Sequence, residues 1–326
     1  MIRAANHSSF PRVGDTPLDQ ELRTALKRRE RAAATDADVA AACEEVTTVC
    51  VAQQSRAFID VVTDGMVRWD GPLSHLVEGF DGLSTAELYR WFETNFYERR
   101  VEVTGELHRA GPFLVEDFEI AHGVAPEKVV KVVLPGPVTF ARLARDRHYG
   151  RTERLAGAVA ELLGQEVAAL AAAGARCFQL DEPLLCRHAE DLELVARCAE
   201  TVFAAAGTGV TVLSTYFGDL SAIGDRLDRL PVTHLGLDMT APANWPLLSR
   251  LPPGCGVHLG LFDARTTRQE DAADVAALLE PHREILLARD LMVGPNAGLE
   301  LLPRDQAFDK LLHARYLVEA LVERWG

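Results

Sequence analysis

Four aspartates stand directly after short apolar runs of this 326-residue chain, in places where a carboxylate can do chemistry. The clearest is Asp181 in CFQLDEPLLC, where an apolar run ends abruptly in two carboxylates and a proline. Burying an unpaired carboxylate is costly, so such a group lies at a strand end or serves a purpose. The other three are Asp64, Asp238 and Asp263.

Arginines and small polar residues accompany these aspartates. Arg12, Arg68 and Arg265 lie close enough in sequence to neutralise them. Carboxylates bind an ammonium group, and an arginine or backbone N–H groups bind a carboxylate, so the set suits a zwitterion such as an amino acid. The predicted catalytic residues are Asp181, Asp64 and Asp263, and the predicted substrate-binding residues are Ser8, Ser9, Arg12, Arg68, Tyr216, Asp238, Arg265 and Asn296, with no metal ligand among them.

Alternating strands and helices must position these residues. Short runs rich in Val, Ile and Leu alternate with helical stretches such as 155–173 and 192–205, which predicts a parallel sheet covered by helices. A doubly wound open sheet is the rival, but no G-x-G-x-x-G follows the first strand, and we favour an α/β fold closed into a (β/α)8 TIM barrel. The expected strands are Ile2–Asn6, Phe58–Thr63, Lys131–Leu134, Cys177–Leu180, Val210–Thr215, His234–Leu237, Gly256–Phe262 and Leu291–Gly294.

One segment breaks this alternation. Residues 68–130 are too many for a single connection and contain ELYRWFETNFYERRVEVTG, which alternates like a pair of strands. We therefore expect one barrel domain over residues 1–326, with residues 68–130 inserted after the second strand as a lid over one end.

Composition and charge narrow the class of partner. The net charge of −14 disfavours nucleic acid and anionic membranes, both of which attract basic patches. No signal peptide or membrane span is expected, which predicts a cytoplasmic protein with a small-molecule substrate. Six cysteines without C-x-x-C spacing indicate reduced, mostly buried thiols.

Three further groups have competing interpretations. Cys186 and His188 are two residues apart and could belong to a displaced zinc site, but a buried Cys186 and a solvated His188 are the favoured interpretation. His258 has the opposite strand parity to Asp263, so it is expected to face the helices. Glu182 should point away from Asp181 and form a salt bridge beneath its loop.

Taken as a set, the strand-end motifs resemble those of cobalamin-independent methionine synthase. The resemblance covers essentially the whole chain and is closest to the metal-free N-terminal barrel of the long enzyme and to single-barrel relatives. No single motif is specific, but their number and order are. They are SSFPR, DVVTDG, VLPGPVTF, FQLDEP, LSTYFGD, LGLDM, LGLFDAR and VGPNAGLELLPRD.

The resemblance implies a barrel that moves a methyl group from methyltetrahydrofolate to homocysteine. In that family zinc, held by His-x-Cys, Glu and a distant Cys, activates the thiol. This chain departs from the pattern, because Leu213-Ser214-Thr215 stands at the His-x-Cys position, Asp238 at the Glu and Ala297 at the distant Cys. Zinc at the usual position is therefore not expected, and the resemblance places Asp181 at the substrate ammonium.

Two classes of function remain open. The first is a transferase moving a methyl or alkyl group to a thiol amino acid such as homocysteine, with Asp64 or Asp263 as general base and methyltetrahydrofolate as a candidate donor. The second is a non-catalytic substrate-binding barrel that acts as partner of a metal-bearing methionine synthase barrel. A barrel rebuilt for carbon–sulfur bond formation or for a lyase reaction is a variant of the first.

Overall fold

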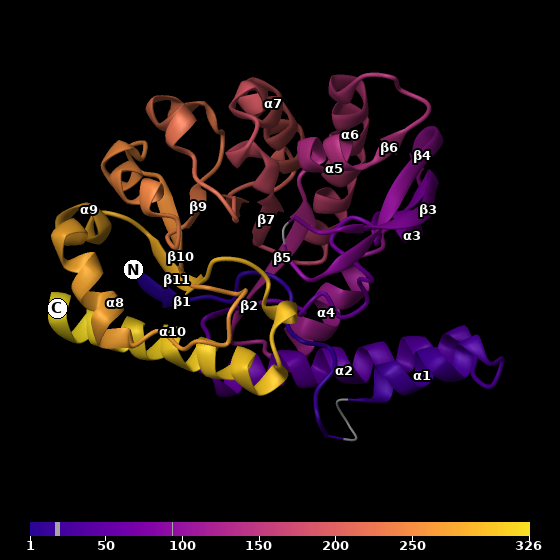
Figure 1. The fold of residues 1–326 in the computed structure, drawn as a ribbon, viewed down its shortest axis with the longest axis horizontal. Coiled ribbons are helices and arrows are strands. Elements are labelled where there is room, and N and C mark those ends of the chain that lie inside the picture. Colours follow the sequence, from indigo (N-terminus) through magenta and orange to yellow (C-terminus); the bar gives the residue numbers. More distant parts are fainter. Residues whose placement is uncertain (17–19, 93) are drawn as a thin grey trace.

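A closed parallel barrel forms the centre of the molecule in the computed structural model, which describes residues 1–16, 20–92 and 94–326 (Figure 1). Its eight-stranded sheet has the order β1-β11-β10-β9-β8-β7-β5-β2, and a parallel bridge from Ala5 to Val61 joins the two outer strands. The predicted (β/α)8 barrel is therefore confirmed. The strands are β1 Ile2–Ala4, β2 Val61–Val62, β5 Val129–Pro135, β7 Cys177–Asp181, β8 Val210–Ser214, β9 His234–Asp238, β10 Gly256–Phe262 and β11 Leu291–Pro295.

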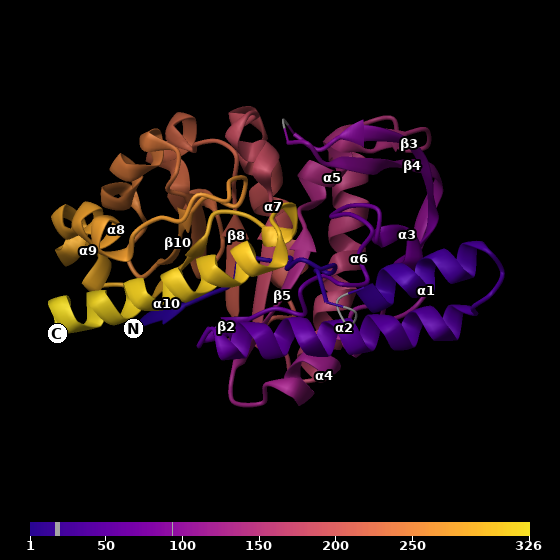
Figure 2. The same ribbon diagram turned by 60° about the horizontal axis from the view of Figure 1, so that its bottom comes forward.

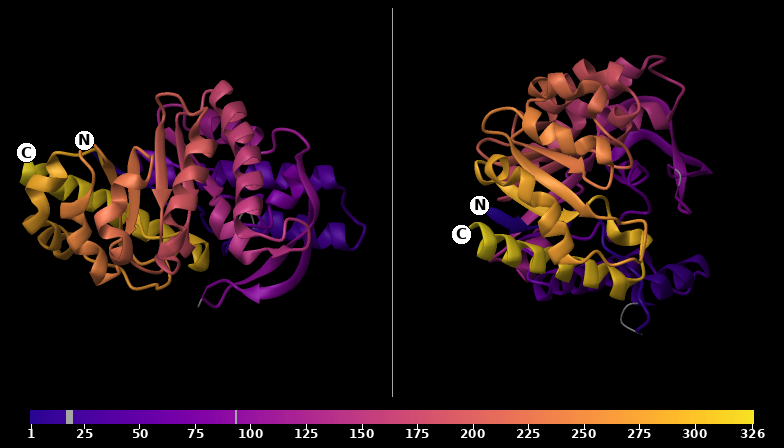
Figure 3. Two further views of the ribbon diagram at one scale, coloured as in Figure 1. Left: turned by 90° about the horizontal axis from the view of Figure 1, so that it is seen from above. Right: turned by 60° about the vertical axis from the view of Figure 1, so that its left-hand side comes forward.

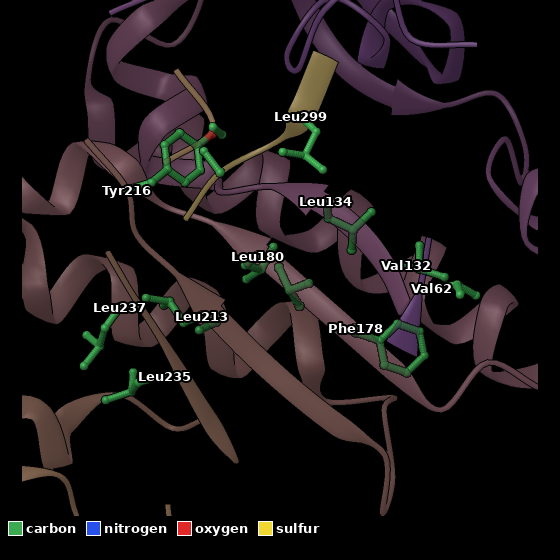
Figure 4. Close-up of a cluster of buried hydrophobic side chains, with 14 of the residues drawn as sticks. Val62, Val132, Leu134, Phe178, Leu180, Leu213, Tyr216, Leu235, Leu237 and Leu299 are labelled. Carbon is green, nitrogen blue, oxygen red and sulfur yellow. The ribbon is translucent and has the colours of Figure 1, made fainter. Parts of the chain in front are cut away.

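Side chains alternate across the barrel wall. Outward positions such as Val132, Leu134 and Leu180 are apolar and join the main hydrophobic core, as Figure 4 shows for these strands. Inward positions on the same strands include Lys131 and Gln179, both with no exposed surface. The strands are thus apolar toward the helices and partly polar toward the barrel axis, which leaves room for chemistry inside.

Helices cover the outside of the barrel. The N-terminal α2 and the C-terminal α10 contact each other and lie along the same side (Figures 1 and 2), and the two chain ends lie near one another (Figure 3). The main helices are α1 Glu21–Glu30, α2 Asp36–Arg56, α4 Val115–Val124, α5 Pro137–Leu143, α6 Thr152–Ala172, α7 Leu192–Phe203, α8 Ala272–Leu279 and α10 Arg304–Trp325, with short helices α3 Leu76–Gly79 and α9 Arg283–Leu287.

Helix α6 is long and apolar enough to cross a membrane by length and composition alone. Half of its apolar window is buried inside the protein, and it packs against α5 and α7. A core helix of a barrel has these same properties, so α6 is explained by its place in the outer layer.

An antiparallel hairpin makes up much of the segment 68–130. Strand β3, Phe80–Arg90, pairs with β4, Tyr97–Arg109, and the short β6, Arg145–Asp146, joins them in a three-stranded sheet beside α6. Arg109 ties the hairpin to the barrel, since its guanidinium donates to the buried Glu166 of α6 at 2.6 and 2.8 Å. The expected strand pair is present, whereas its action as a lid stays a prediction.

A bulge in β10 overturns the prediction for His258. Gly260 pairs with Gly294, but Phe262 pairs with the next residue of β11, Pro295, so one extra residue is inserted there. The bulge changes the strand parity, and His258 consequently faces the barrel interior, with its ring centroid 5.6 Å from that of His7. Counting positions back from Asp263 could not reveal this inserted residue.

Candidate active site

A small cavity lies at the carboxyl ends of the barrel strands, beside Asp181. Its volume is about 30 Å³, and it is bordered by the hairpin residue Trp91 on one side. Of the predicted site residues, Asp181, Ser8, Ser9 and Tyr216 meet here. The other residues on its wall are Met66, Pro72, Phe217, Ala297, Gly298, Glu300 and Leu301.

Asp181 is held by its own strand. Gln179, two residues earlier and on the same side of β7, donates from Nε2 to Asp181 Oδ1 at 2.7 Å. Burial is the main cause that raises the pKa of Asp181 to about 7, and Glu182 and Glu300 add to it, while Gln179 and Lys131 oppose it. The carboxylate is therefore poised between its charged and neutral forms near neutral pH.

The serines after β1 are fixed from within the barrel. The Ser8 hydroxyl is 2.9 Å from Nδ1 of His7, whose Nε2 lies 2.8 Å from the Ser214 hydroxyl. The Ser9 carbonyl accepts from the Leu299 N–H at 3.0 Å. Burial lowers the pKa of His7 well below its usual value, so this ring acts as a neutral hydrogen-bonding bridge.

A larger cavity adjoins the first. It has a volume of about 220 Å³ and shares Met66, Pro72 and Glu300 with the cavity beside Asp181. Arg12 lies on its wall and donates to the Trp69 carbonyl, so the guanidinium belongs to this neighbouring space. The shared residues place the two cavities side by side, with Asp181 on the wall of the first and Arg12 on the wall of the second.

Two carboxylates at this opening were missed by sequence reasoning. Glu300 faces both cavities, and burial raises its pKa, while a hydrogen bond from Ser9 opposes the rise. Glu98 of β4 is 2% exposed, and burial followed by repulsion from Glu300 raises its pKa to about 8. Glu300 follows the eighth strand, so the rule that found Asp181 could have found it, whereas nothing in the hairpin sequence singles out Glu98.

Asp64 and Arg68 lie elsewhere. Asp64 lines a separate small cavity beneath α4 with Asp117, and Arg68 Nε is 2.6 Å from Asp117 Oδ1. Strand alternation explains the difference, because Thr63 contacts the Ser8 carbonyl at the mouth and the next side chain turns outward. Burial raises the pKa of Asp64 to about 6. The expectation that all four strand-end aspartates share one opening is therefore corrected.

Asp238 and Asn296 shape the mouth without lining either cavity. Asp238 is 1% exposed and accepts from the Phe217 N–H at 2.9 Å, from Thr240, and from Asn296 Nδ2 at 3.0 Å. Asn296 also accepts from the Ala264 N–H at 2.9 Å. These bonds fix the loop that presents Phe217. Asp238 and Asn296 therefore support this loop and do not themselves line the cavity.

Asp263 and Arg265 lie at the rim. The Arg265 Nε donates to Asp263 Oδ1 at 3.1 Å, and its guanidinium lies 4.9 Å from the centre of the Phe217 ring. Phe217 separates this pair from the cavity that it lines. The predicted neutralisation of Asp263 by Arg265 is present, but the pair does not reach Asp181.

Glu182 caps a helix instead of forming the expected salt bridge. Its carboxylate accepts from the N–H groups of Val138 and Thr139, at 2.9 and 2.8 Å, in the first turn of α5. Burial raises its pKa to about 7. Asp181 and Glu182 thus point in different directions, as strand alternation requires, and only the first serves the cavity.

The donor set at the family's zinc position does not fit a zinc ion. Ser214 is bonded to His7, Asp238 is fully occupied as described above, and Ala297 offers no donor atom. Across residues 1–16, 20–92 and 94–326 no three His, Cys, Asp or Glu side chains are placed to hold one metal ion. The pair Cys186 and His188 accordingly finds no third ligand there, and we derive no step through zinc.

Comparison with known proteins decides the family. Residues 10–320 match the model of the cobalamin-independent synthase catalytic domain. The chain belongs to the cobalamin-independent methionine synthase family. This membership places it among methyltransferases. The matching model is that of the catalytic domain.

The chain covers most of the length of the relatives that it matches. A methionine synthase of Sulfurisphaera tokodaii is 27% identical over 92% of this chain and 88% of its own, and one of Sulfolobus acidocaldarius is 25% identical over the same shares. A B12-independent methionine synthase structure from Shewanella, in complex with selenomethionine, superposes with a TM-score of 0.84 at 19% identity, covering 99% of this chain and 98% of that one. The structural likeness independently confirms the fold.

Proposed function

We propose that this protein transfers a methyl group to the sulfur of a thiol amino acid such as homocysteine, bound at the mouth of the barrel. One observation carries the proposal, namely the convergence of Asp181, Ser8, Ser9 and Tyr216 on one cavity. The methionine synthases among its relatives and the selenomethionine in the Shewanella structure support a sulfur amino acid such as homocysteine or methionine as the ligand.

Each wall of the cavity has a distinct part in this proposal. Asp181 accepts from the ligand ammonium, and the backbone around Ser8 and Ser9 faces the ligand carboxylate. Glu300 faces both cavities and replaces Asp64 and Asp263 as the candidate proton acceptor for the thiol, because burial raises its pKa and makes its carboxylate a stronger base. The larger cavity, with Arg12 on its wall, is left for the methyl donor, and methyltetrahydrofolate is the first donor to try.

Binding and turnover should be measured separately. Calorimetric titration of the purified protein with L-homocysteine and L-methionine is expected to show binding that Asp181→Asn weakens at least tenfold. Asp225→Asn is the matched control, since the Asp225 side chain is 89% exposed and lies outside both cavities. Methionine formation from homocysteine and methyltetrahydrofolate is then followed by mass spectrometry.

The outcomes discriminate between the functions. Wild-type protein that neither binds these amino acids nor forms methionine from any methyl donor would refute the transferase. If methionine forms only after a second, metal-bearing methionine synthase barrel is added, the partner-subunit function is the correct one.

A further inference from the structure

A lysine is enclosed inside the barrel beneath the site. Lys131 of β5 has no exposed surface, and its ammonium donates to Gln179 Oε1 at 2.6 Å. Burying an ammonium group beside a neutral amide is costly, and burial lowers the pKa of Lys131 to about 8. A buried lysine that the catalytic proposal does not use calls for a physical role.

The ammonium decides the orientation of the Gln179 side chain. An ammonium has only donors, so the oxygen of the amide must face Lys131 and its NH2 group must face the other way. There Nε2 donates to Asp181 Oδ1 at 2.7 Å and to the His7 carbonyl at 3.1 Å. Without the lysine the amide oxygen would lose this donor, and the side chain would be held only through its NH2 group.

We propose that Lys131 is a positioning residue, which fixes the Gln179 amide so that Asp181 is held as a charged acceptor for the ligand ammonium. The inference deepens the proposed function and rests on it, because it assigns a role in binding the amino-acid substrate. The group acts through Gln179 and touches no ligand itself.

The groups that face Asp181 set the expected response to pH. Gln179 and Lys131 favour its charged form, whereas burial, Glu182 and Glu300 favour its neutral form. Around Lys131 itself, Cys177 and Asp181 favour the ammonium. Removing the lysine removes a stabilising charge and a fixed donor together, so Asp181 should lose its proton only at a higher pH.

The test compares affinity for L-methionine from pH 6 to 9 in the wild type and in Lys131→Met. Methionine has a similar length without the charge, and the hydrogen-bond partner that it leaves behind, the Gln179 amide, is uncharged. Wild-type affinity should rise as the pH passes about 7, the pKa of Asp181, and should fall again above about 8, where Lys131 loses its proton. The variant should bind about fivefold more weakly at pH 7, because its rise should move upward by about one pH unit.

Further variants separate positioning from damage to the fold. Gln179→Met should reproduce the defect, and adding Lys131→Met to it should cause little further loss, because the lysine acts through the amide. Lys128→Met, just before the same strand and outside the barrel, should leave the profile unchanged. Circular dichroism and thermal unfolding verify that each variant is folded.

Each result bears on one proposal or on both. An unchanged profile for Lys131→Met, an equal loss at every pH, or additive losses in the double variant would overturn the positioning role alone. Wild-type protein that binds neither homocysteine nor methionine would refute the proposed function and this inference with it.

Discussion

Glu98→Gln is expected to stabilise the protein at pH 8 while leaving its stability at pH 5 nearly unchanged. Glu98 lies on β4, and within residues 1–16, 20–92 and 94–326 both of its buried carboxylate oxygens lack a hydrogen-bond partner. The side chain packs so closely on the 70–72 loop that a Cβ added to Gly71 would lie 1.4 Å from Oε2. The charged form is therefore excluded from water, and glutamine reproduces the neutral form.

The size of the effect follows from the raised pKa. Burial moves the pKa of Glu98 from 4.5 to about 8, with a further contribution from Glu300. A raised folded-state pKa gives stability that is complete below the unfolded-state value and is lost as the pH rises through the folded-state value. At about 1.4 kcal/mol for each pKa unit, this carboxylate should cost the wild type about 3 kcal/mol between pH 5 and pH 8.

Urea unfolding at pH 5 and pH 8 measures this cost directly. The free energy of unfolding of Glu98→Gln should exceed that of the wild type by about 3 kcal/mol more at pH 8 than at pH 5. Glu106→Gln, on the same strand but with its side chain 72% exposed, serves as the control and should show no such difference. If the wild type and Glu98→Gln differ equally at the two pH values, Glu98 is not the buried neutral acid described above.

Three further substitutions test other parts of the structure by chemical unfolding. Arg109→Met should lower the free energy of unfolding by about 3 kcal/mol, because it leaves the fully buried Glu166 with backbone donors only. A loss under about 1 kcal/mol would show that this ion pair does not anchor the hairpin. Glu182→Gln should cost about 2 kcal/mol by losing one of the two hydrogen bonds to the first turn of α5, and unchanged stability would refute the cap. Gly294→Ala should lower the free energy of unfolding by at least about 2 kcal/mol, because its Cβ would lie 2.0 Å from the Ala5 carbonyl oxygen. Gly157→Ala in α6 is the control. Its Cβ would meet no described atom within 4 Å, so it should leave the stability unchanged or raise it.

The placement of the cavity at the barrel mouth was within reach of the sequence. Parallel strands end at one edge, so residues that follow different strands, such as Ser8, Asp181 and Tyr216, must gather there. This rule does not predict which side of the barrel wall a side chain faces. Asp64 also follows a strand, but its side chain turns outward beneath α4, and one residue of offset decides on which side of the wall a group lies.

The sequence by itself determined the barrel, its family and the end at which the candidate site lies, because strand pattern and strand-end motifs are local features of the chain. Only the tertiary structure decided which polar groups meet. The bulge after Gly260 turned His258 inward, the hairpin brought Glu98 over the mouth, and Lys131 came to lie under Asp181 through its neighbour on β7. Contacts between strands and across an insertion depend on register and packing, which no local spacing encodes.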